Sequence, residues 1–158
     1  MNLTELQIAC HNASHASGWW HHPDSGLPYI PGDSAVGGLE WHALRECTRE
    51  MIVHYWPFVL ATKIALIHSE VSEGLEGLRK NLMDDKLVHR LGLETELADS
   101  LIRTFDIGGA IERARFHGIV EVKAPFDLHS AVGEKMSFNA VRPDHKVAAR
   151  RAAGGKSF

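Results

Sequence analysis

The chain has 158 residues, of which 44% are hydrophobic and 23% are charged, and its formal net charge is −3. This length and composition are typical of one soluble domain with its own core, and they exclude a disordered chain. The slight negative charge argues against a surface that binds polyanions in general, so we expect no nucleic-acid partner. A local cationic pocket that binds a small anion is still compatible with this net charge.

The cysteines and the apolar runs bear on the compartment. Cys10 and Cys47 are the two cysteines, too few for a disulfide framework or a Cys-x-x-Cys zinc site. The first residues lack a basic segment followed by an apolar one, and the longest apolar run is broken at Lys63, short of the roughly 18 residues that a membrane-spanning helix needs. We therefore expect a cytoplasmic protein without a membrane partner.

The first half of the chain predicts three helices of an all-α fold. One short helix begins at Leu3 and stops near Gly18, and residues 21–38 are predicted to be a long loop because proline and glycine are dense there. A second helix covers about 40–55, and Pro57 starts or kinks a third helix, about 58–80. Apolar side chains at helical spacing give this third helix a stripe, formed by Leu60, Ile64, Ile67, Val71, Leu75 and Leu78.

The second half predicts two further helices. After a charged link, a long helix is expected over 87–117, although its glycines weaken the pattern. Residues 119–123 alternate weakly but have no partner strand, so we interpret them as a connector. A last helix covers 127–141 with Asp127 as its cap, Pro143 ends it, and a basic tail follows. We expect a single domain, 1–158.

Two pairs of acidic residues are the most informative feature. Glu70 and Glu73 lie three residues apart in one predicted helix, and Glu96 and Asp99 lie three apart in the next. At roughly 100° per residue, such a pair projects both carboxylates from nearly one face of its helix. One pair alone is usually a solvated face. Two pairs on facing antiparallel helices would repel unless a hard divalent cation lay between them, and Mg²⁺ is the first to expect.

Basic side chains continue along the same helices. Lys63 lies two turns before Glu70, and Arg103 lies two turns beyond Glu96. Asp106 extends this polar line two turns beyond Asp99. Each of these charges either meets a phosphate chain or is an ordinary surface charge.

Aromatic and polar residues near the two ends offer further candidates. Trp19 and Trp20 follow Gly18, so that one ring could stack on a base while the other packs, or both could belong to the core. Three polar residues share one helical edge near the C-terminus and would suit the outer oxygens of a triphosphate: Lys135, Asn139 and Arg142.

The sequence allows three other interpretations. His11 and His15 have the spacing of a helical zinc pair, but spacing fixes no third ligand and His21 lies in the predicted loop, so a structural or surface role is favoured. A di-iron bundle would need Glu-x-x-His on two helices, and no glutamate has a histidine three residues later. The non-enzymatic alternative is a helical interaction module whose glutamates are merely solvated and whose basic tail binds a partner.

The acidic pairs resemble a known signature. Glu70-x-x-Glu73 followed by Glu96-Leu97-Ala98-Asp99 resembles the motif of the MazG-type all-α nucleoside triphosphate pyrophosphohydrolases. The resemblance is strong over residues 60–110 and is closest to the small phage-encoded members. Two features depart from the family pattern: Ser69 stands where many members have another glutamate, and the loop over 21–38 is long.

The resemblance implies an antiparallel helix bundle that hydrolyses a nucleoside triphosphate between the α and β phosphates, giving the monophosphate and pyrophosphate. It implies an enzyme of nucleotide metabolism that uses Mg²⁺, with Mn²⁺ as a substitute, and assembles as a homo-oligomer, a dimer or tetramer, in the host cytoplasm if a phage encodes it. A purine deoxynucleotide such as dGTP is favoured, with dCTP or dUTP as the alternative.

The resemblance also assigns roles to residues. It implies that four carboxylates bind the metal, Glu70, Glu73, Glu96 and Asp99, and that Glu70 or Glu73 is the general base. Together with the basic and aromatic candidates, the expected substrate-binding set is Lys63, Trp20, Arg103, Lys135, Asn139 and Arg142.

Overall fold

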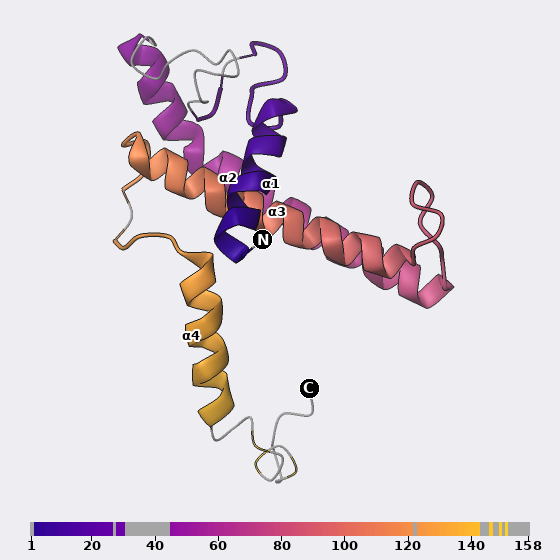
Figure 1. The fold of residues 1–158 in the computed structure, drawn as a ribbon. Coiled ribbons are helices and arrows are strands. Elements are labelled where there is room, and N and C mark those ends of the chain that lie inside the picture. The colour runs from indigo at the N-terminus through magenta and orange to yellow at the C-terminus, as the bar shows by residue number, and fades with distance from the viewer. Residues whose placement is uncertain are drawn as a thin grey trace. The chain divides into compact units, whose positions relative to one another are not determined.

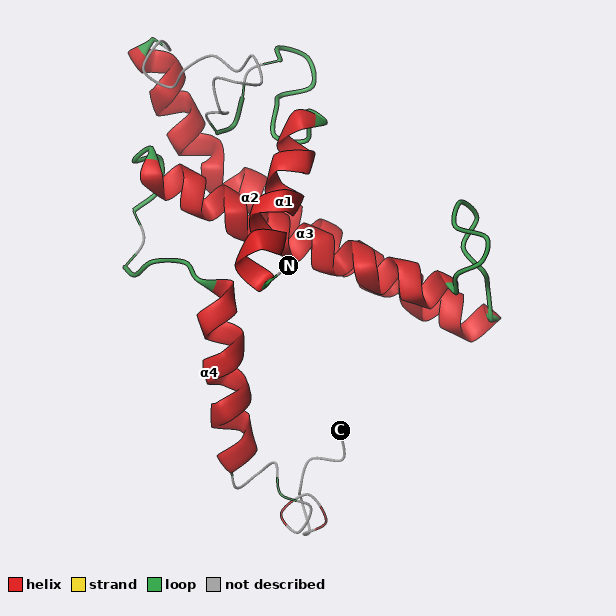
Figure 2. Cartoon of the chain, viewed as in Figure 1, coloured by secondary structure: helices red, strands yellow, loops and turns green. Residues whose placement is uncertain are grey.

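The computed structural model describes residues 2–26, 28–30, 45–121 and 123–142, together with residues 146, 149 and 151. Over these ranges the protein is all-α and contains no strand, as predicted (Figures 1 and 2). Its four helices are α1 (Leu3–Ala16), α2 (Glu46–Lys80), α3 (Gly92–Phe116) and α4 (Leu128–Val141). The chain divides into two compact units, residues 1–126 and 127–158, and each is described by itself.

α1 begins and ends where the sequence predicts. Asn2 is its N-cap: its side chain accepts from the Glu5 backbone N–H, and the Glu5 carboxylate accepts from the Asn2 backbone N–H, each at 2.9 Å. This reciprocal pair satisfies two of the backbone donors that a helix start leaves free. The helix stops just before Gly18, whose φ of +82° is a conformation that glycine adopts without strain.

α2 corrects the prediction of two helices separated at Pro57. It is one continuous helix of 35 residues with Pro57 in its interior. A proline removes one helical hydrogen bond, but its neighbour Trp56 is buried and stacks on Trp20 with the ring centroids 5.9 Å apart. This packing holds the helix at the proline. The predicted helix start near residue 40, like most of the predicted loop over 21–38, lies outside the described residues.

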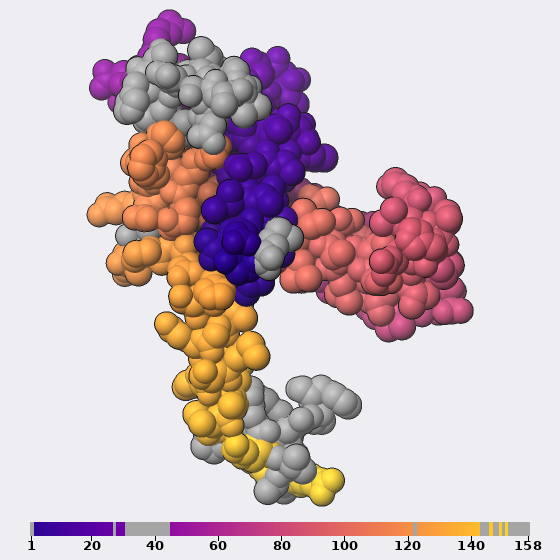
Figure 3. Space-filling model, viewed as in Figure 1, coloured from indigo at the N-terminus to yellow at the C-terminus, as the bar shows by residue number. Residues whose placement is uncertain are grey.

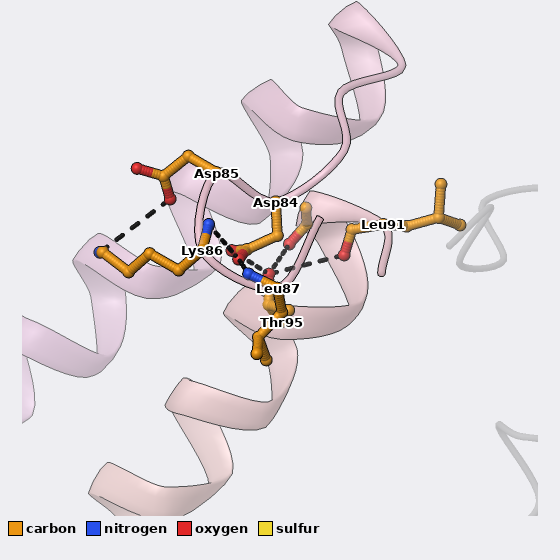
Figure 4. Close-up of polar contacts among 7 residues, drawn as sticks. Asp84, Asp85, Lys86, Leu87, Leu91 and Thr95 are labelled. Atoms are coloured by element: carbon orange, nitrogen blue, oxygen red, sulfur yellow. Dashed lines mark hydrogen bonds and ion pairs between the residues drawn. The ribbon is translucent and has the colours of Figure 1, made fainter. Parts of the chain in front are cut away.

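α3 begins at Gly92, five residues after the predicted start. The link from α2 includes a closed loop around Asp84, whose carboxylate accepts from the backbone N–H groups of Lys86 and Leu87 and from the Thr95 hydroxyl (Figure 4). Asp84 therefore ties the loop to the first turn of α3. The same bonds hold the pKa of Asp84 below its ordinary value, and they fix residues 85–91 outside the helix.

α2 and α3 form an antiparallel hairpin that is closest near its turn. A Cβ atom at Gly74 would lie 3.2 Å from the Glu96 Cβ, and one at Gly77 would lie 3.3 Å from the Leu93 nitrogen. In the C-terminal half of α2, the side that faces α3 is therefore formed by the buried residues Glu70, Gly74 and Gly77. Small residues on this side bring the α3 backbone next to the Glu70 carboxylate.

The apolar stripe predicted for this part of α2 is only partly buried in the single chain. Ile67 and Leu60 are partly buried against the core, but four members are about half exposed: Ile64, Val71, Leu75 and Leu78. They lie about 100° around the helix from the buried side that faces α3. By length and composition, α2 is also the one helix among the described residues that could cross a membrane.

The core lies around the crossing of α1, α3 and the first half of α2. It comprises Trp20, Ile30, Ile52, Trp56, Ile107, Ala110, Ile111, Ala114 and Ile119. Figure 3 shows the N-terminal segment lying directly against the part of the chain that contains α3. A Cβ atom at Gly109 would stand 2.4 Å from the His11 Cβ, so this glycine permits the close approach of α1 to α3.

α4 matches its prediction. Asp127 is the N-cap and its carboxylate accepts from the Ser130 backbone N–H at 3.1 Å and from the Ser130 hydroxyl at 2.6 Å. The helix contains no buried residue. Pro143 lies outside the described residues, as does most of the predicted tail. The described part of the connector, residues 119–121 and 123, contains no strand, as expected.

Candidate metal and phosphate site

Three of the four predicted metal ligands come together between α2 and α3. One carboxylate oxygen from each of Glu70, Glu96 and Asp99 lies within 4.8 Å of the other two. Glu70 is buried at 7% exposure, Glu96 is partly buried and Asp99 is exposed. Because the helices are antiparallel, the i,i+3 pairs face each other as their spacing predicts.

Glu73, the fourth predicted ligand, is not in this group of three. It lies one turn beyond Glu70 on the exposed side of α2, where its carboxylate accepts a hydrogen bond from the Ser69 hydroxyl at 3.0 Å. Its charge still acts on the cluster, because it contributes to the raised pKa of Glu96. Ser69, the residue that departs from the family pattern, thus orients a neighbouring carboxylate.

Repulsion between the carboxylates of the cluster affects the pKa of Glu96. Burial, followed by a hydrogen bond with Glu70 and the charges of Glu70, Glu73 and Asp99, raises the pKa of Glu96 to about 7. A proton therefore resides in the cluster near neutral pH and relieves the repulsion between the carboxylates. A divalent cation would displace it. Oxygen donors alone, in a strongly acidic cluster, fit a hard ion such as Mg²⁺.

We expect the affinity for Mg²⁺ to rise about tenfold between pH 6 and pH 8, because Glu96 must lose its proton when a cation binds. Calorimetric titration in two buffers of different ionisation enthalpy measures the protons released. Glu96→Gln is the control and should release none. An affinity independent of pH, with no proton release by the unaltered chain, would contradict the assignment.

The same shift sets how stability depends on pH without metal. Above pH 4.5 the unfolded chain loses the Glu96 proton while the folded chain keeps it, so this contribution to stability falls as pH rises through about 7. His15 acts in the opposite sense. Burial lowers its pKa below 6.5, so protonation of the unfolded chain reduces stability only as pH falls below that value. The two contributions therefore oppose each other below about pH 6.5, where the ranges over which they change overlap.

The two predicted phosphate-binding cations lie beside the acidic cluster. Arg103 donates from Nε to the Glu70 Oε1 at 2.6 Å, and its Nη2 forms an ion pair with the same oxygen at 2.6 Å. Lys63 donates to the backbone carbonyl of Trp19 at 2.6 Å, and its Nζ lies 4.8 Å from the centre of the Trp20 ring. Burial lowers the pKa of Lys63. Both cations have further N–H groups for a ligand.

A pocket of about 190 Å³ joins these features. Its walls come from α1, the turn after it, α2 and α3, and are formed by Ser14, Trp19, Lys63, Asp99, Ile102, Arg103, Asp106 and Ile107. Asp99 belongs to both the pocket and the acidic cluster. The pocket thus presents two cations next to a group of oxygen ligands, an arrangement suited to a phosphate chain that carries a divalent cation.

Trp20, predicted to bind substrate, contacts residues of this pocket but does not line it. Its ring is fully buried, at 0% exposure, and its Nε1 donates to Asp106 at 2.8 Å. A buried ring cannot stack on a base, so the assignment to Trp20 is corrected. Trp19 is 59% exposed and lines the pocket, so of these two adjacent tryptophans it is the one that a ligand can reach.

The three remaining predicted contacts belong to the unit formed by residues 127–158. Lys135 and Arg142 both lie over the ring of Phe138, at 5.2 and 5.7 Å from its centre, so they share one edge of the C-terminal segment as the spacing predicts. Asn139 is partly buried, and its Oδ1 has no hydrogen-bond partner among the described residues. A role of these residues in substrate binding stays a prediction.

Asp106 has a role that the sequence did not reveal. It is buried, and one of its carboxylate oxygens, Oδ1, is 2.8 Å from both the His11 Nδ1 and the Trp20 Nε1. From its spacing, two turns beyond Asp99, the sequence predicted only that Asp106 continues the polar side of this helix. Its partners His11 and Trp20 come from α1 and from the turn after it, and spacing within one helix cannot predict such contacts.

No protein-family model matches this chain, and comparisons with curated proteins and with solved structures find no similar chain either. The resemblance to the MazG-type enzymes therefore depends on the motif residues alone.

Proposed function

We propose that the protein is a Mg²⁺-dependent nucleoside triphosphate pyrophosphohydrolase that releases pyrophosphate by cleaving between the α and β phosphates. One observation carries the proposal: the carboxylates of Glu70, Glu96 and Asp99 converge beside a pocket that also presents Lys63 and Arg103. A solvated acidic face, as in a mere interaction module, would not need two cations aligned with it. The antiparallel α2–α3 hairpin is also the geometry that a MazG-type bundle requires.

In this proposal the acidic side chains bind the metal and the basic side chains bind the phosphates. When bound, Mg²⁺ would supply Lewis acidity that neutralises phosphate charge and activates water. Glu70, Glu96 and Asp99 would hold the cation, while Lys63 and Arg103 bind phosphate oxygens and balance the charge that develops on them. Arg103 does this while keeping the buried Glu70 carboxylate paired.

Glu73 is the better candidate for the general base. Glu70 is buried and its Oε1 accepts from Arg103, so its other oxygen is left to face the cluster. Glu73 is exposed beside the cluster and is oriented by the Ser69 hydroxyl. An exposed carboxylate next to the metal-binding group can take a proton from water and pass it to solvent.

The nucleobase of the substrate would lie against Trp19. The exposed indole lines the same pocket as Lys63, and a purine offers the larger surface for stacking, which supports dGTP over the pyrimidine triphosphates. Another pocket, of about 570 Å³, is lined by aromatic residues such as Tyr55 and Phe58. The lining of this pocket includes none of the carboxylates of the acidic cluster.

We expect Trp19→Ala to raise KM for the preferred triphosphate by roughly 5- to 100-fold, the range that loss of one stacking contact produces. The melting temperature should change little, because the ring is exposed. Steady-state kinetics and thermal unfolding measure the two effects. Phe116→Ala removes another exposed ring as the control. An unchanged KM would remove Trp19 from the base site.

A second copy of the chain would cover the exposed apolar residues of the hairpin. Val71, Leu75 and Leu78 on α2, and Leu97 and Leu101 on α3, are each about half exposed. Such rows on a stable soluble protein are usually buried in an interface. The charged residues that share these helices, Glu70 and Arg103 among them, favour a protein partner over lipid.

A substrate panel tests the proposal. The purified protein is given each ribo- and deoxynucleoside triphosphate with Mg²⁺, and pyrophosphate is measured. Release from a purine deoxynucleotide supports the proposal, and preference for dCTP or dUTP would move the specificity to pyrimidines. No release from any triphosphate, together with no stabilisation by Mg²⁺, would leave the interaction module as the function.

A further inference from the structure

Three histidine rings gather on the side of α1 that faces α3 and the turn after Gly18. His11 and His15 lie one turn apart on α1, with their ring centroids 6.1 Å apart. The turn brings His21 back, so that its ring centroid lies 5.1 Å from that of His15. The turn therefore supplies the third ring that helical spacing could not.

The rings share a feature that calls for a ligand. His11 and His15 are buried, at 2% and 5% exposure. The His11 Nε2, the His15 Nε2 and the His21 Nδ1 are all buried nitrogen atoms without a hydrogen-bond partner among the described residues. Buried polar atoms nearly always have a partner, and three neighbouring exceptions on the residue type that binds transition metals are unusual.

The outer contacts of the rings are those of metal-binding histidines. The Asp106 carboxylate accepts from the His11 Nδ1 at 2.8 Å, which places the proton on Nδ1 and leaves the Nε2 lone pair available. The His15 ring in turn donates to the Ile30 backbone carbonyl. Carboxylate or carbonyl groups on the far nitrogen are the usual means of orienting a metal-bound imidazole.

From these contacts we infer that His11, His15 and His21 form a second metal site, for Zn²⁺, distinct from the carboxylate cluster. Three imidazole nitrogens suit zinc and leave a fourth position for water. With Zn–N bonds of roughly 2 Å in a tetrahedral arrangement, ring centroids stand about 5 Å apart. The His15 and His21 rings are at 5.1 Å, and the His11 and His15 rings are farther apart, at 6.1 Å. The carboxylate cluster, with oxygen ligands alone, selects a harder ion.

Binding a metal requires the histidine rings to rotate. Among the described residues, the acidic group is the one whose ligand atoms already lie within 4.8 Å of one another, so the histidine nitrogens must turn toward a common point.

A zinc ion here would fix the turn that carries Trp19. His21 lies two residues after Trp19, whose backbone carbonyl holds Lys63. Tying His21 to α1 would therefore position both the exposed indole and the lysine of the pocket. The role of the metal is structural, and it goes beyond the hydrolysis proposed above.

Zinc titration of the full chain, purified without added metal and held in excess Mg²⁺, tests the inference. His15→Gln and His21→Ala remove ligands, and His89→Ala, an exposed histidine of the α2–α3 link, is the matched control. We expect one Zn²⁺ per chain, an affinity at least about 100-fold weaker in both ligand variants, and no change in the control. Asp106→Asn should weaken binding by about 10- to 100-fold.

Cobalt provides a second readout. Co²⁺ in the unaltered chain should give the visible absorption of a tetrahedral complex, and His21→Ala, whose ring lies in a surface turn, should lose it while keeping its helix content. No zinc binding by the unaltered chain, or equal zinc affinity in both ligand variants, would overturn the inference. So would zinc binding that Asp99→Asn abolishes and His21→Ala leaves intact, because the zinc would then lie among the carboxylates.

Discussion

Replacing Asp99 with asparagine is expected to abolish pyrophosphate release and, without Mg²⁺, to raise the melting temperature. Asp99 is exposed at the meeting point of the acidic cluster and the pocket. Loss of one metal-binding carboxylate should reduce kcat/KM by roughly 10³-fold or more. The same change removes one of the charges that raise the pKa of Glu96. Asp99 is the weakest of these causes and is exposed, so solvent screens its charge and the rise in Tm should be small.

The opposite signs of the two effects make the experiment informative. Glu94→Gln is the matched control: Glu94 lies on the same helix but pairs with Arg90 on another face, and its replacement should leave activity unchanged. Pyrophosphate release and thermal unfolding, with and without Mg²⁺, are measured on both variants. If Asp99→Asn remained active, Asp99 would not be part of the site. A lower Tm without metal would mean that the carboxylates support the fold.

Arg103→Gln is expected to lower both activity and stability, for two separate reasons. Loss of a phosphate-binding cation should reduce kcat by about 100-fold or more. Loss of the partner of Glu70 leaves a buried carboxylate unpaired, which should lower the free energy of unfolding by about 2–4 kcal/mol. Mg²⁺ should restore part of this stability, because the unpaired carboxylate gains a cation.

Two variants separate these effects. Arg90→Gln breaks an ion pair of the same length, 2.6 Å, whose partners are about half exposed, and should change stability by less than about 1 kcal/mol. The double variant Glu70→Gln, Arg103→Gln removes the buried charge together with its partner, so it should recover most of the stability while staying inactive. Urea unfolding and pyrophosphate release measure both. Equal destabilisation by Arg90→Gln and Arg103→Gln would contradict a special role for the Glu70 pair.

The helices could be predicted because their signals are local. Asn2 and Asp127 cap helices through side chains that lie within four residues of the groups they bind. The facing of the two carboxylate pairs follows from helical spacing once the helices are antiparallel. For the same reason Glu70, Glu96 and Asp99 could be identified before the fold was known.

Long-range packing decided the features that the sequence did not predict. The stripe of α2 contains the apolar residues, but glycines at Gly74, Gly77 and Gly92 let the backbones approach on a different face, and this face is buried. Pro57 stays inside a helix because Trp56 stacks on Trp20. The choice between two adjacent tryptophans depends on the turn at Gly18, since their local sequence is nearly the same.

The bond between Lys63 and the carbonyl of Trp19 has a consequence for how the protein can change over evolution. The acceptor belongs to the main chain, so replacing the side chain at position 19 leaves the lysine with the same partner. In the proposed site, selection of the nucleobase could then change without a change in phosphate binding. Substitutions at residue 19 could shift substrate preference in small steps while the triphosphate remained held.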